Sequence, residues 1–128
     1  MKEIIFNQAA PDPIGPYSQA VRFGHMVFTS GQVALDAATG TMLQNNLQEE
    51  AHQVMKNLQL VLQASGAEFK HVVKTTIFLT DMAFFSEVNE VYGSYFPDGT
   101  FPARETVQVS ALPRQARVEI SMIACLPQ

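Results

Sequence analysis

The stretch NLQEEAHQVMKNLQLVLQASG, residues 46–66, carries the clearest helical period in the sequence and decides the fold. Its apolar residues recur at steps of three and four, which places them on one stripe of a helix: Leu47, Ala51, Val54, Leu58, Val61 and Leu62. Asn46 is suited to cap this helix, and Glu49 is placed to complete a capping box. Gly66 can end the helix in a left-handed conformation. The segment therefore predicts an amphipathic helix that buries one face.

Short runs rich in β-branched residues surround this helix and predict strands. They are residues 2–6, 19–23, 26–35, 71–80, 105–109 and 117–125, with a hairpin turn at Gly24 and His25. A second helix is expected over residues 81–96, capped by Asp81. The order is β-β-β-α-β-α-β-β. It predicts a single α+β domain, residues 1–128, in which two helices pack on one face of a mixed sheet.

The other face of this sheet has no obvious cover. In the last strand Val118, Ile120, Met122 and Ala124 share one side, and Arg117, Glu119, Ser121 and Ile123 share the other. A chain of 128 residues has no third layer to place there, and only 16% of its residues are charged. We therefore expect an oligomer in which sheet faces are turned inward.

Composition excludes several classes of protein. The net charge of −4 lacks the positive excess that drives nucleic-acid binding. One cysteine rules out an internal disulfide and zinc sites built on cysteine pairs, and the three histidines lie too far apart for a metal site. Neither of the glycine-rich nucleotide-binding motifs, GxxxxGK[ST] and GxGxxG, is present. Apolar runs are too short for a signal peptide or a membrane span, so we expect a soluble, cytoplasmic protein without a membrane partner.

Arg104 and Glu119 are the main candidates for chemistry. Arg104, in FPARETVQV (101–109), carries a permanent charge and a planar fork that matches a carboxylate. Its partner is an acidic side chain of the protein, water or a ligand, and the scarcity of nearby charges favours a substrate carboxylate. Glu119 has two interpretations. It is a carboxylate on the sheet face, either exposed to water or paired with Arg114 or Arg117. Alternatively, it is a half-buried residue that orients or deprotonates a water.

Four other residues also have both a structural and a functional interpretation. Tyr17 follows a Gly-Pro corner, where its ring either packs on the core or directs its phenol into a pocket. Ser30 and Gly31 end a strand, and Gly31 could allow a ligand to approach the backbone closely. Asn89 lies beside the apolar stripe of the second helix, as a surface residue or a site residue. No GxSxG motif is present, so no serine is predicted to be a nucleophile.

Several strings of the sequence coincide with one family. They are IGPYSQA (14–20), FTSGQVALDAATG (28–40), VVKTTIFLTDM (72–82), FFSEVNEVYGSYF (84–96) and FPARETVQVSALPRQARVEISMIA (101–124). In these strings the chain resembles the Rid/YjgF family of imine deaminases, some of which are also described as translation inhibitors or endoribonucleases. The resemblance implies a chorismate-mutase-like homotrimer with clefts between subunits. It also implies hydrolysis of 2-imino acids, such as 2-iminobutanoate and 2-iminopropanoate, to 2-keto acids and ammonia, without a metal ion or organic cofactor.

The resemblance also implies roles for individual residues. Arg104 would hold the substrate carboxylate, Glu119 would act on the hydrolytic water with Tyr17 as a further catalytic residue, and the other residues that line the cleft would be Ser30, Gly31, Asn89 and Thr106. Many deaminases have Ser and Cys where this chain has Glu105 and Thr106. Strand alternation predicts that Glu105 points away from the pocket. A non-catalytic trimer that binds small carboxylates is the main alternative function, and a translation inhibitor or endoribonuclease is the third.

Overall fold

The computed structural model describes all 128 residues and confirms the helix that the sequence predicts after Asn46. Helix α1 spans Leu47–Ala64, and the Asn46 side chain caps it by accepting a hydrogen bond from the Glu49 N–H at 2.8 Å. Gly66 follows with a φ of 86°, a left-handed conformation that glycine adopts without strain. The reciprocal half of the capping box is not formed, because the Glu49 carboxylate accepts from the Asn45 side chain at 3.5 Å instead.

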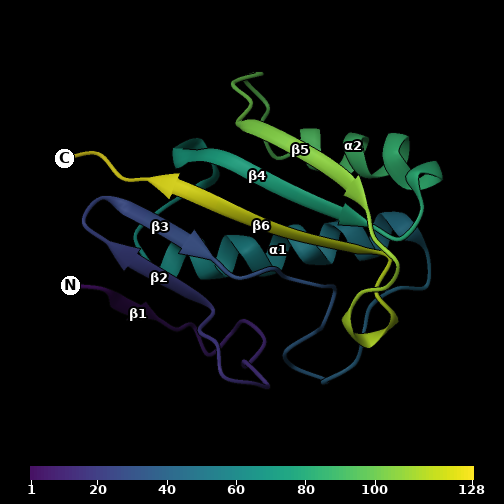
Figure 1. Ribbon diagram of the computed structural model, residues 1–128, viewed down its shortest axis with the longest axis horizontal. Coiled ribbons are helices and arrows are strands. Elements are labelled where there is room, and N and C mark those ends of the chain that lie inside the picture. The colour runs from purple at the N-terminus through teal and green to yellow at the C-terminus, as the bar shows by residue number, and fades with distance from the viewer.

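Six strands form one mixed sheet in the order β1-β2-β3-β6-β4-β5 (Figure 1). Their bounds are β1 (Glu3–Ile5), β2 (Ala20–Phe23), β3 (Met26–Thr29), β4 (Val72–Leu79), β5 (Ala103–Gln108) and β6 (Val118–Cys125). Strands β4 and β5 run parallel, and all other neighbouring strands are antiparallel. The predicted α+β architecture and element order are therefore confirmed.

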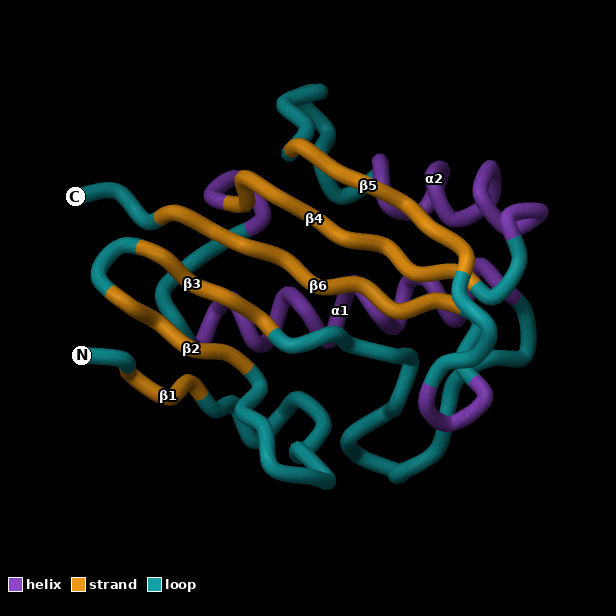
Figure 2. The backbone as a smooth tube through the Cα atoms, viewed as in Figure 1, coloured by secondary structure: helices purple, strands orange, loops and turns teal.

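The second helix is shorter than the sequence predicts. A 3-10 turn spans Met82–Phe84, and the Asp81 side chain accepts from the Ala83 N–H at 2.8 Å, so Asp81 caps this turn. Helix α2 follows over Phe85–Gly93 and connects β4 to β5 on the same side of the sheet as α1 (Figure 2). The segment expected as one helix is thus two helical pieces, because the Asp81 cap starts a tight turn that only then relaxes into an α-helix.

Both helices cover one face of the sheet, as predicted. The alternation of buried and less buried side chains in β6 identifies the face that they cover. Val118, Ile120, Met122 and Ala124 are at most 2% exposed and pack with the apolar stripe of α1. The intervening residues of β6 are half-buried or exposed and point to the opposite face.

No element of the chain covers that opposite, open face of the sheet, which Figure 1 shows with α1 behind it. Four apolar residues cross it in register from strand to strand: Ile4, Val21, Phe28 and Ile123. Ile4 is 56% exposed and Phe28 is 43% exposed. An apolar row of this kind is a surface suited to a protein partner.

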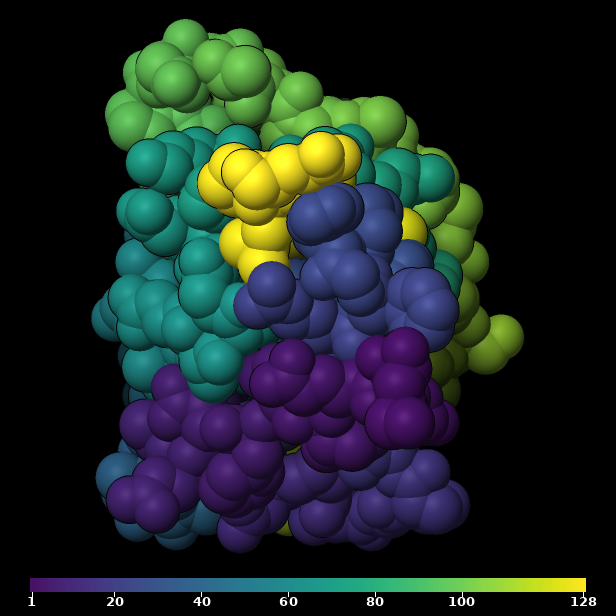
Figure 3. Space-filling model, turned by 90° about the vertical axis from the view of Figure 1, so that its left-hand side faces the viewer, coloured from purple at the N-terminus to yellow at the C-terminus, as the bar shows by residue number.

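Both termini lie at one end of the sheet. Figure 3 looks at this end and shows the C-terminal segment in yellow above the hairpin of β2 and β3, with the N-terminal segment in purple below it. Strand β6 begins at the other end of the sheet, so its second residue, Glu119, lies away from the termini. None of the helices combines the length and the apolar character that crossing a membrane requires.

Candidate functional site

A cavity of about 340 Å³ lies where the loop after β1 meets the segments after β3 and before β6. Four of the predicted site residues line it: Tyr17, Ser30, Gly31 and Glu119. Its volume falls in the range of small-molecule sites, ~300–1,000 Å³. The structure thus brings together residues that are more than one hundred positions apart in the sequence.

Gly31 and Glu119 are in direct contact in this cavity. Strand β3 ends at Thr29, earlier than predicted, and the chain then rejoins β6 through paired backbone hydrogen bonds between Gln32 and Ile120 of 2.9 and 3.1 Å. The pairing of Gln32 with Ile120 places the Gly31 backbone directly beside the Glu119 side chain. A Cβ added to Gly31 would lie only 2.5 Å from a carboxylate oxygen of Glu119. The Glu119 side chain thus occupies the space that a Cβ at position 31 would take, so a larger residue there must displace it.

The Glu119 carboxylate has no hydrogen-bond or ion-pair partner in the chain. It is partly buried, and burial raises the pKa of Glu119 above its usual value of 4.5. The carboxylate is thus a stronger base than an exposed glutamate and is free to accept a proton.

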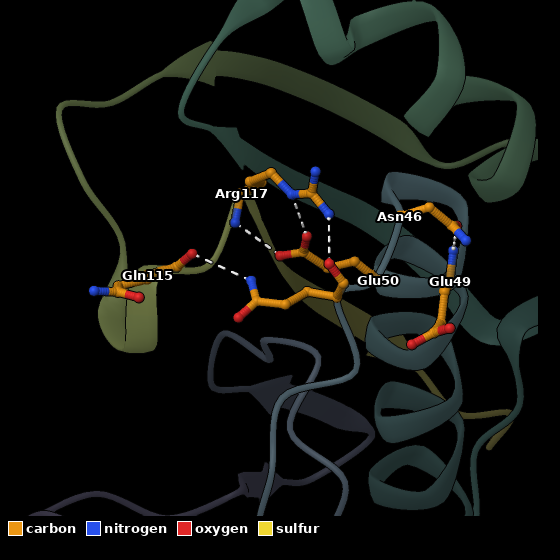
Figure 4. A network of polar contacts seen from close by, with 6 residues as sticks. Asn46, Glu49, Glu50, Gln115 and Arg117 are labelled. Carbon is orange, nitrogen blue, oxygen red and sulfur yellow. Dashed lines mark hydrogen bonds and ion pairs between the residues drawn. The ribbon is translucent and has the colours of Figure 1, made fainter.

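Arg117 does not pair with Glu119, and its predicted place on the open face is wrong. It precedes β6, and its backbone N–H and its Nε both donate to the buried Glu50 carboxylate of α1 at 2.7 Å (Figure 4). Its guanidinium also donates to the Gln44 carbonyl at 3.0 Å. The buried Glu50 therefore draws Arg117 to the helix side, and this anchor fixes the start of β6 two residues before Glu119.

Ser30 and Tyr17 form the wall of the cavity beside Gly31. The Ser30 hydroxyl donates to the Ser18 carbonyl at 2.6 Å, and the Ser30 N–H donates to the Gln19 carbonyl at 2.9 Å. Ser30 therefore fixes the Tyr17 loop to the end of β3, while its oxygen retains lone pairs. The Tyr17 side chain is exposed and borders the cavity, so its phenol is available to a ligand.

Arg104 lines a second hollow, of about 330 Å³, together with Asn89 and residues of the loop before β5. The guanidinium carbon lies 5.2 Å from the centre of the Tyr92 ring and 5.7 Å from that of Phe85. No carboxylate of the chain pairs with Arg104. A protein carboxylate, one of the three partners that the sequence left open for Arg104, is therefore absent within the chain.

Thr106 and Glu105 lie on opposite sides of β5, as strand alternation predicts. The Thr106 hydroxyl is buried and has no hydrogen-bond partner, although it points to the same side as Arg104. The exposed Glu105 accepts from the Thr76 hydroxyl and pairs with Lys74 at 2.9 Å on the other side. These two contacts, that of Thr76 first, lower the pKa of Glu105.

The structure does not bring Arg104 and Glu119 together within one chain. Arg104 is in register with Thr75 of β4, which is fully buried beneath the helices. Glu119 is in register with Phe78 of β4, and Phe78 with Val107 of β5, on the open face. The two candidate catalytic residues therefore point to opposite faces of the sheet.

Phe85, Tyr92 and Arg114 contact these sites but were not among the site residues predicted from the sequence. Phe85 and Tyr92 flank Arg104, and their i, i+7 spacing on either side of Asn89 is a helical pattern that could have revealed them. Arg114 lines the Glu119 cavity from a left-handed backbone conformation with a φ of 58°. Nothing in the local sequence signals that conformation, which non-glycine residues rarely adopt.

The chain belongs to the family described as Endoribonuclease L-PSP, which matches residues 7–126, and this confirms the Rid/YjgF resemblance. Protein DfrA of Myxococcus xanthus is 56% identical over 125 residues, or 96% of this chain and 95% of that protein. A 2-iminobutanoate/2-iminopropanoate deaminase of Mus musculus is 48% identical over 97% of this chain and 91% of its own. The crystal structure of E. coli TdcF with bound serine, 38% identical, superposes with a TM-score of 0.93 over 98% of this chain and 99% of that chain.

Proposed function

We propose that this protein hydrolyses reactive 2-imino acids, such as 2-iminobutanoate and 2-iminopropanoate, to 2-keto acids and ammonia. The observation that carries the proposal is Arg104, a permanent cation that lines an open hollow and has no carboxylate partner in its own chain. A carboxylate is an anion that such a fork binds through two parallel hydrogen bonds. The substrate class comes from relatives that are named 2-iminobutanoate/2-iminopropanoate deaminases.

The complete site would lie between subunits of a homotrimer. One chain presents Arg104 and Glu119 on opposite faces of its sheet, so a small substrate that touches both must lie between two chains. The exposed apolar row on the open face supplies a surface for this assembly. Each cleft would combine the Arg104 hollow of one subunit with the Glu119 cavity of the next.

In this cleft Arg104 binds the substrate carboxylate through two parallel hydrogen bonds and fixes the position of the C=N carbon. The imine enters protonated on nitrogen. Glu119 takes a proton from a water as the water oxygen bonds to the C=N carbon, which gives a neutral carbinolamine. Glu119 then returns this proton to the amine nitrogen, the C–N bond breaks to release ammonia, and the hydroxyl proton passes to Glu119 and on to solvent as the C–O bond becomes C=O. One water is consumed for each keto acid and ammonia released, and burial of Glu119, which raises the pKa of its carboxyl, makes the carboxylate a stronger base for the first step.

The remaining site residues would divide between the two halves of the cleft. Tyr17, a further catalytic residue in this proposal, and Ser30 would place hydrogen-bonding groups near the water and the departing nitrogen, and Gly31 would let the substrate approach the backbone. Asn89 and the unpartnered hydroxyl of Thr106 would complete the Arg104 half.

The test uses an amino-acid oxidase to generate the imino acid, with semicarbazide to trap what is not hydrolysed. Wild-type protein should lower semicarbazone formation. Arg104→Ala should lose at least about 100-fold in kcat/KM, because a charge-assisted bidentate contact is lost. Glu119→Gln should lose on the order of 100-fold in kcat while it still binds 2-ketobutyrate.

Arg22→Ala is the matched control for the loss of an arginine, since Arg22 binds backbone carbonyls and lines neither cavity. It should retain wild-type activity. An Arg104→Ala variant that is folded and fully active would remove the basis of the proposal.

A second candidate is a non-catalytic trimer that binds small carboxylates. It is favoured by the solved structure of TdcF, which contains bound serine, an amino acid with an α-carboxylate. The two functions differ in one result: a binding module would bind 2-ketobutyrate through Arg104 and leave semicarbazone formation unchanged. RNA cleavage, the activity in the family description, should be absent because the chain carries a net charge of −4.

A further inference from the structure

Arg104 is held by two aromatic rings of α2 in place of a carboxylate. Its guanidinium carbon lies 5.2 Å from the Tyr92 ring centre and 5.7 Å from that of Phe85, within the ~6 Å reach of cation–π attraction. We propose that Phe85 and Tyr92 are positioning residues that hold the Arg104 guanidinium and leave its N–H groups free for a ligand carboxylate. The functional part of this inference rests on the proposed imine hydrolysis.

The contrast with Arg117 supports this assignment. Arg117 is fixed by the Glu50 carboxylate, which occupies its Nε, while a backbone carbonyl occupies its terminal nitrogen. Those donors are no longer available. Arg104 has no such partner, so the ring faces orient the cation without using its hydrogen-bonding capacity.

The Tyr92 ring is itself fixed. Its hydroxyl donates to the Thr75 hydroxyl at 2.9 Å, and both side chains are buried, with Tyr92 4% and Thr75 0% exposed. Thr75 of β4 is also the register partner of Arg104 in β5. The pairing of β4 with β5 therefore fixes the position of Arg104 along the sheet, and through Thr75 it also fixes the position of the Tyr92 ring. Burial raises the pKa of Tyr92, so its phenol stays protonated and keeps donating to Thr75.

Helix α2 presents both rings to Arg104 because of their spacing. Phe85, Asn89 and Tyr92 follow each other at i, i+4 and i+7, which places them on one face of the helix. Asn89 also lines the hollow beside Arg104. This face of α2 thus carries two aromatic rings that contact Arg104 and one polar side chain, Asn89, that lines the hollow.

A purely structural explanation is that the rings only fill the core, since Tyr92 also packs against Phe96 with ring centres 5.0 Å apart. The two explanations differ in the effect of exchanging the rings for aliphatic groups. Core packing predicts a less stable protein with unchanged kinetics in its folded fraction. If the rings position Arg104, the variants should bind the substrate carboxylate more weakly, although the charge of Arg104 is unchanged.

The experiment measures kcat and KM for 2-iminobutanoate, and Kd for 2-ketobutyrate, in Phe85→Leu and Tyr92→Leu. Both variants should lose roughly 3- to 10-fold in carboxylate affinity, seen mainly in KM and Kd, as expected from the usual strength of cation–π contacts. Tyr92→Phe keeps the ring and should restore affinity to within about 3-fold of wild type. Phe84→Leu, the same exchange one position before Phe85, is the matched control because its ring has no such contact with Arg104.

A second readout is independent of any catalytic activity. The side-chain Nε–H of Arg104, labelled with ¹⁵N-arginine and assigned through Arg104→Lys, should show an upfield ring-current shift in the wild type. Phe85→Leu should reduce this shift even if Tyr92→Leu does not fold. A wild-type resonance at the position of solvent-exposed arginines would overturn the aromatic support itself.

The two readouts separate failure of this inference from failure of the proposed function. Wild-type protein that neither hydrolyses imines nor binds keto acids refutes the proposed function, and the ring-current shift then decides the aromatic support alone. An active wild type whose Phe85→Leu and Tyr92→Leu variants lose the shift but keep KM, Kd and kcat refutes the positioning role. Joint loss of shift and affinity, with Tyr92→Phe near wild type, supports it.

Discussion

At the scale of single residues, Gly31 is the glycine of this chain with the least room for a side chain. A Cβ there would lie 2.5, 2.7 and 2.9 Å from three atoms of the Glu119 side chain, so Gly31→Ala must displace that side chain. We expect a fall in kcat/KM of roughly 10- to 100-fold with little loss of thermal stability, because a displacement near 1 Å can cost this much. Gly15→Ala is the control, since its nearest contacts would be ordinary at 3.6 Å. Wild-type kinetics in Gly31→Ala would mean that the position of Glu119 does not matter to the reaction.

Glu119 should also make the protein less stable as pH rises. Its raised pKa means that the folded state binds more protons than the unfolded state between the usual value of 4.5 and the folded pKa. The free energy of unfolding therefore falls as pH increases through that window, and the loss persists at neutral pH. Glu119→Gln should be more thermostable than wild type at pH 7, with a difference that shrinks below about pH 4. Thermal unfolding across this pH range tests it, and a less stable Gln variant at pH 7 would show that the assembly supplies a partner for the carboxylate.

At the scale of elements, the Glu50–Arg117 pair joins α1 to the start of β6. Glu50 is fully buried and accepts two hydrogen bonds of 2.7 Å from Arg117 (Figure 4). Glu50→Gln removes the charge and replaces one acceptor with a donor, and it should lower the free energy of unfolding by about 3 kcal/mol, as for other broken buried pairs. Chemical denaturation measures this loss. Glu49→Gln, its neighbour in the first turn, should change stability by less than about 0.5 kcal/mol, and equal losses in both variants would argue against a special role for the pair.

The strands and the long helix were predictable because their periods are properties of local sequence. The alternation of β6 and the stripe of α1 both place apolar residues on the buried side, and the structure confirms them. Arg117 was misplaced because its direction depends on Glu50, 67 positions away, and not on strand alternation. The early end of β3 has a similar cause, since the bridge between Gln32 and Ile120 is a long-range contact. Sequence patterns therefore identified the candidate residues but could not show which of them share a cavity.

At the scale of the whole molecule, the arrangement of the sheet gives one physical reason for assembly. The open face carries an apolar row, and Val107 of β5 is also 42% exposed there. Glu119 lies at one margin of this face, whereas Arg104 lies under α2 at the edge strand β5. Covering the open face with neighbouring chains would bury the apolar row and would also bring an edge strand of one chain to the Glu119 cavity of another. The same step that removes apolar surface from water would then complete the site.

This composite site makes a quantitative prediction for mixed oligomers. Arg104→Ala lacks one half of each site and Glu119→Gln lacks the other, so neither variant alone should be active. After the two are unfolded and refolded together in equal amounts, roughly a quarter of the sites should combine an intact Arg104 with an intact Glu119 from the neighbouring chain, if subunits mix at random in a cyclic trimer. Activity should recover to about that fraction of wild type.

The control mixes Arg104→Ala with the double variant Arg104→Ala/Glu119→Gln, which offers no intact Arg104 and should stay inactive. Native mass spectrometry shows whether mixed trimers have formed. Mixed trimers without recovered activity would mean that both residues must come from one chain. That result would contradict the opposite orientation of Arg104 and Glu119 in the sheet, because the substrate is too small to reach both faces.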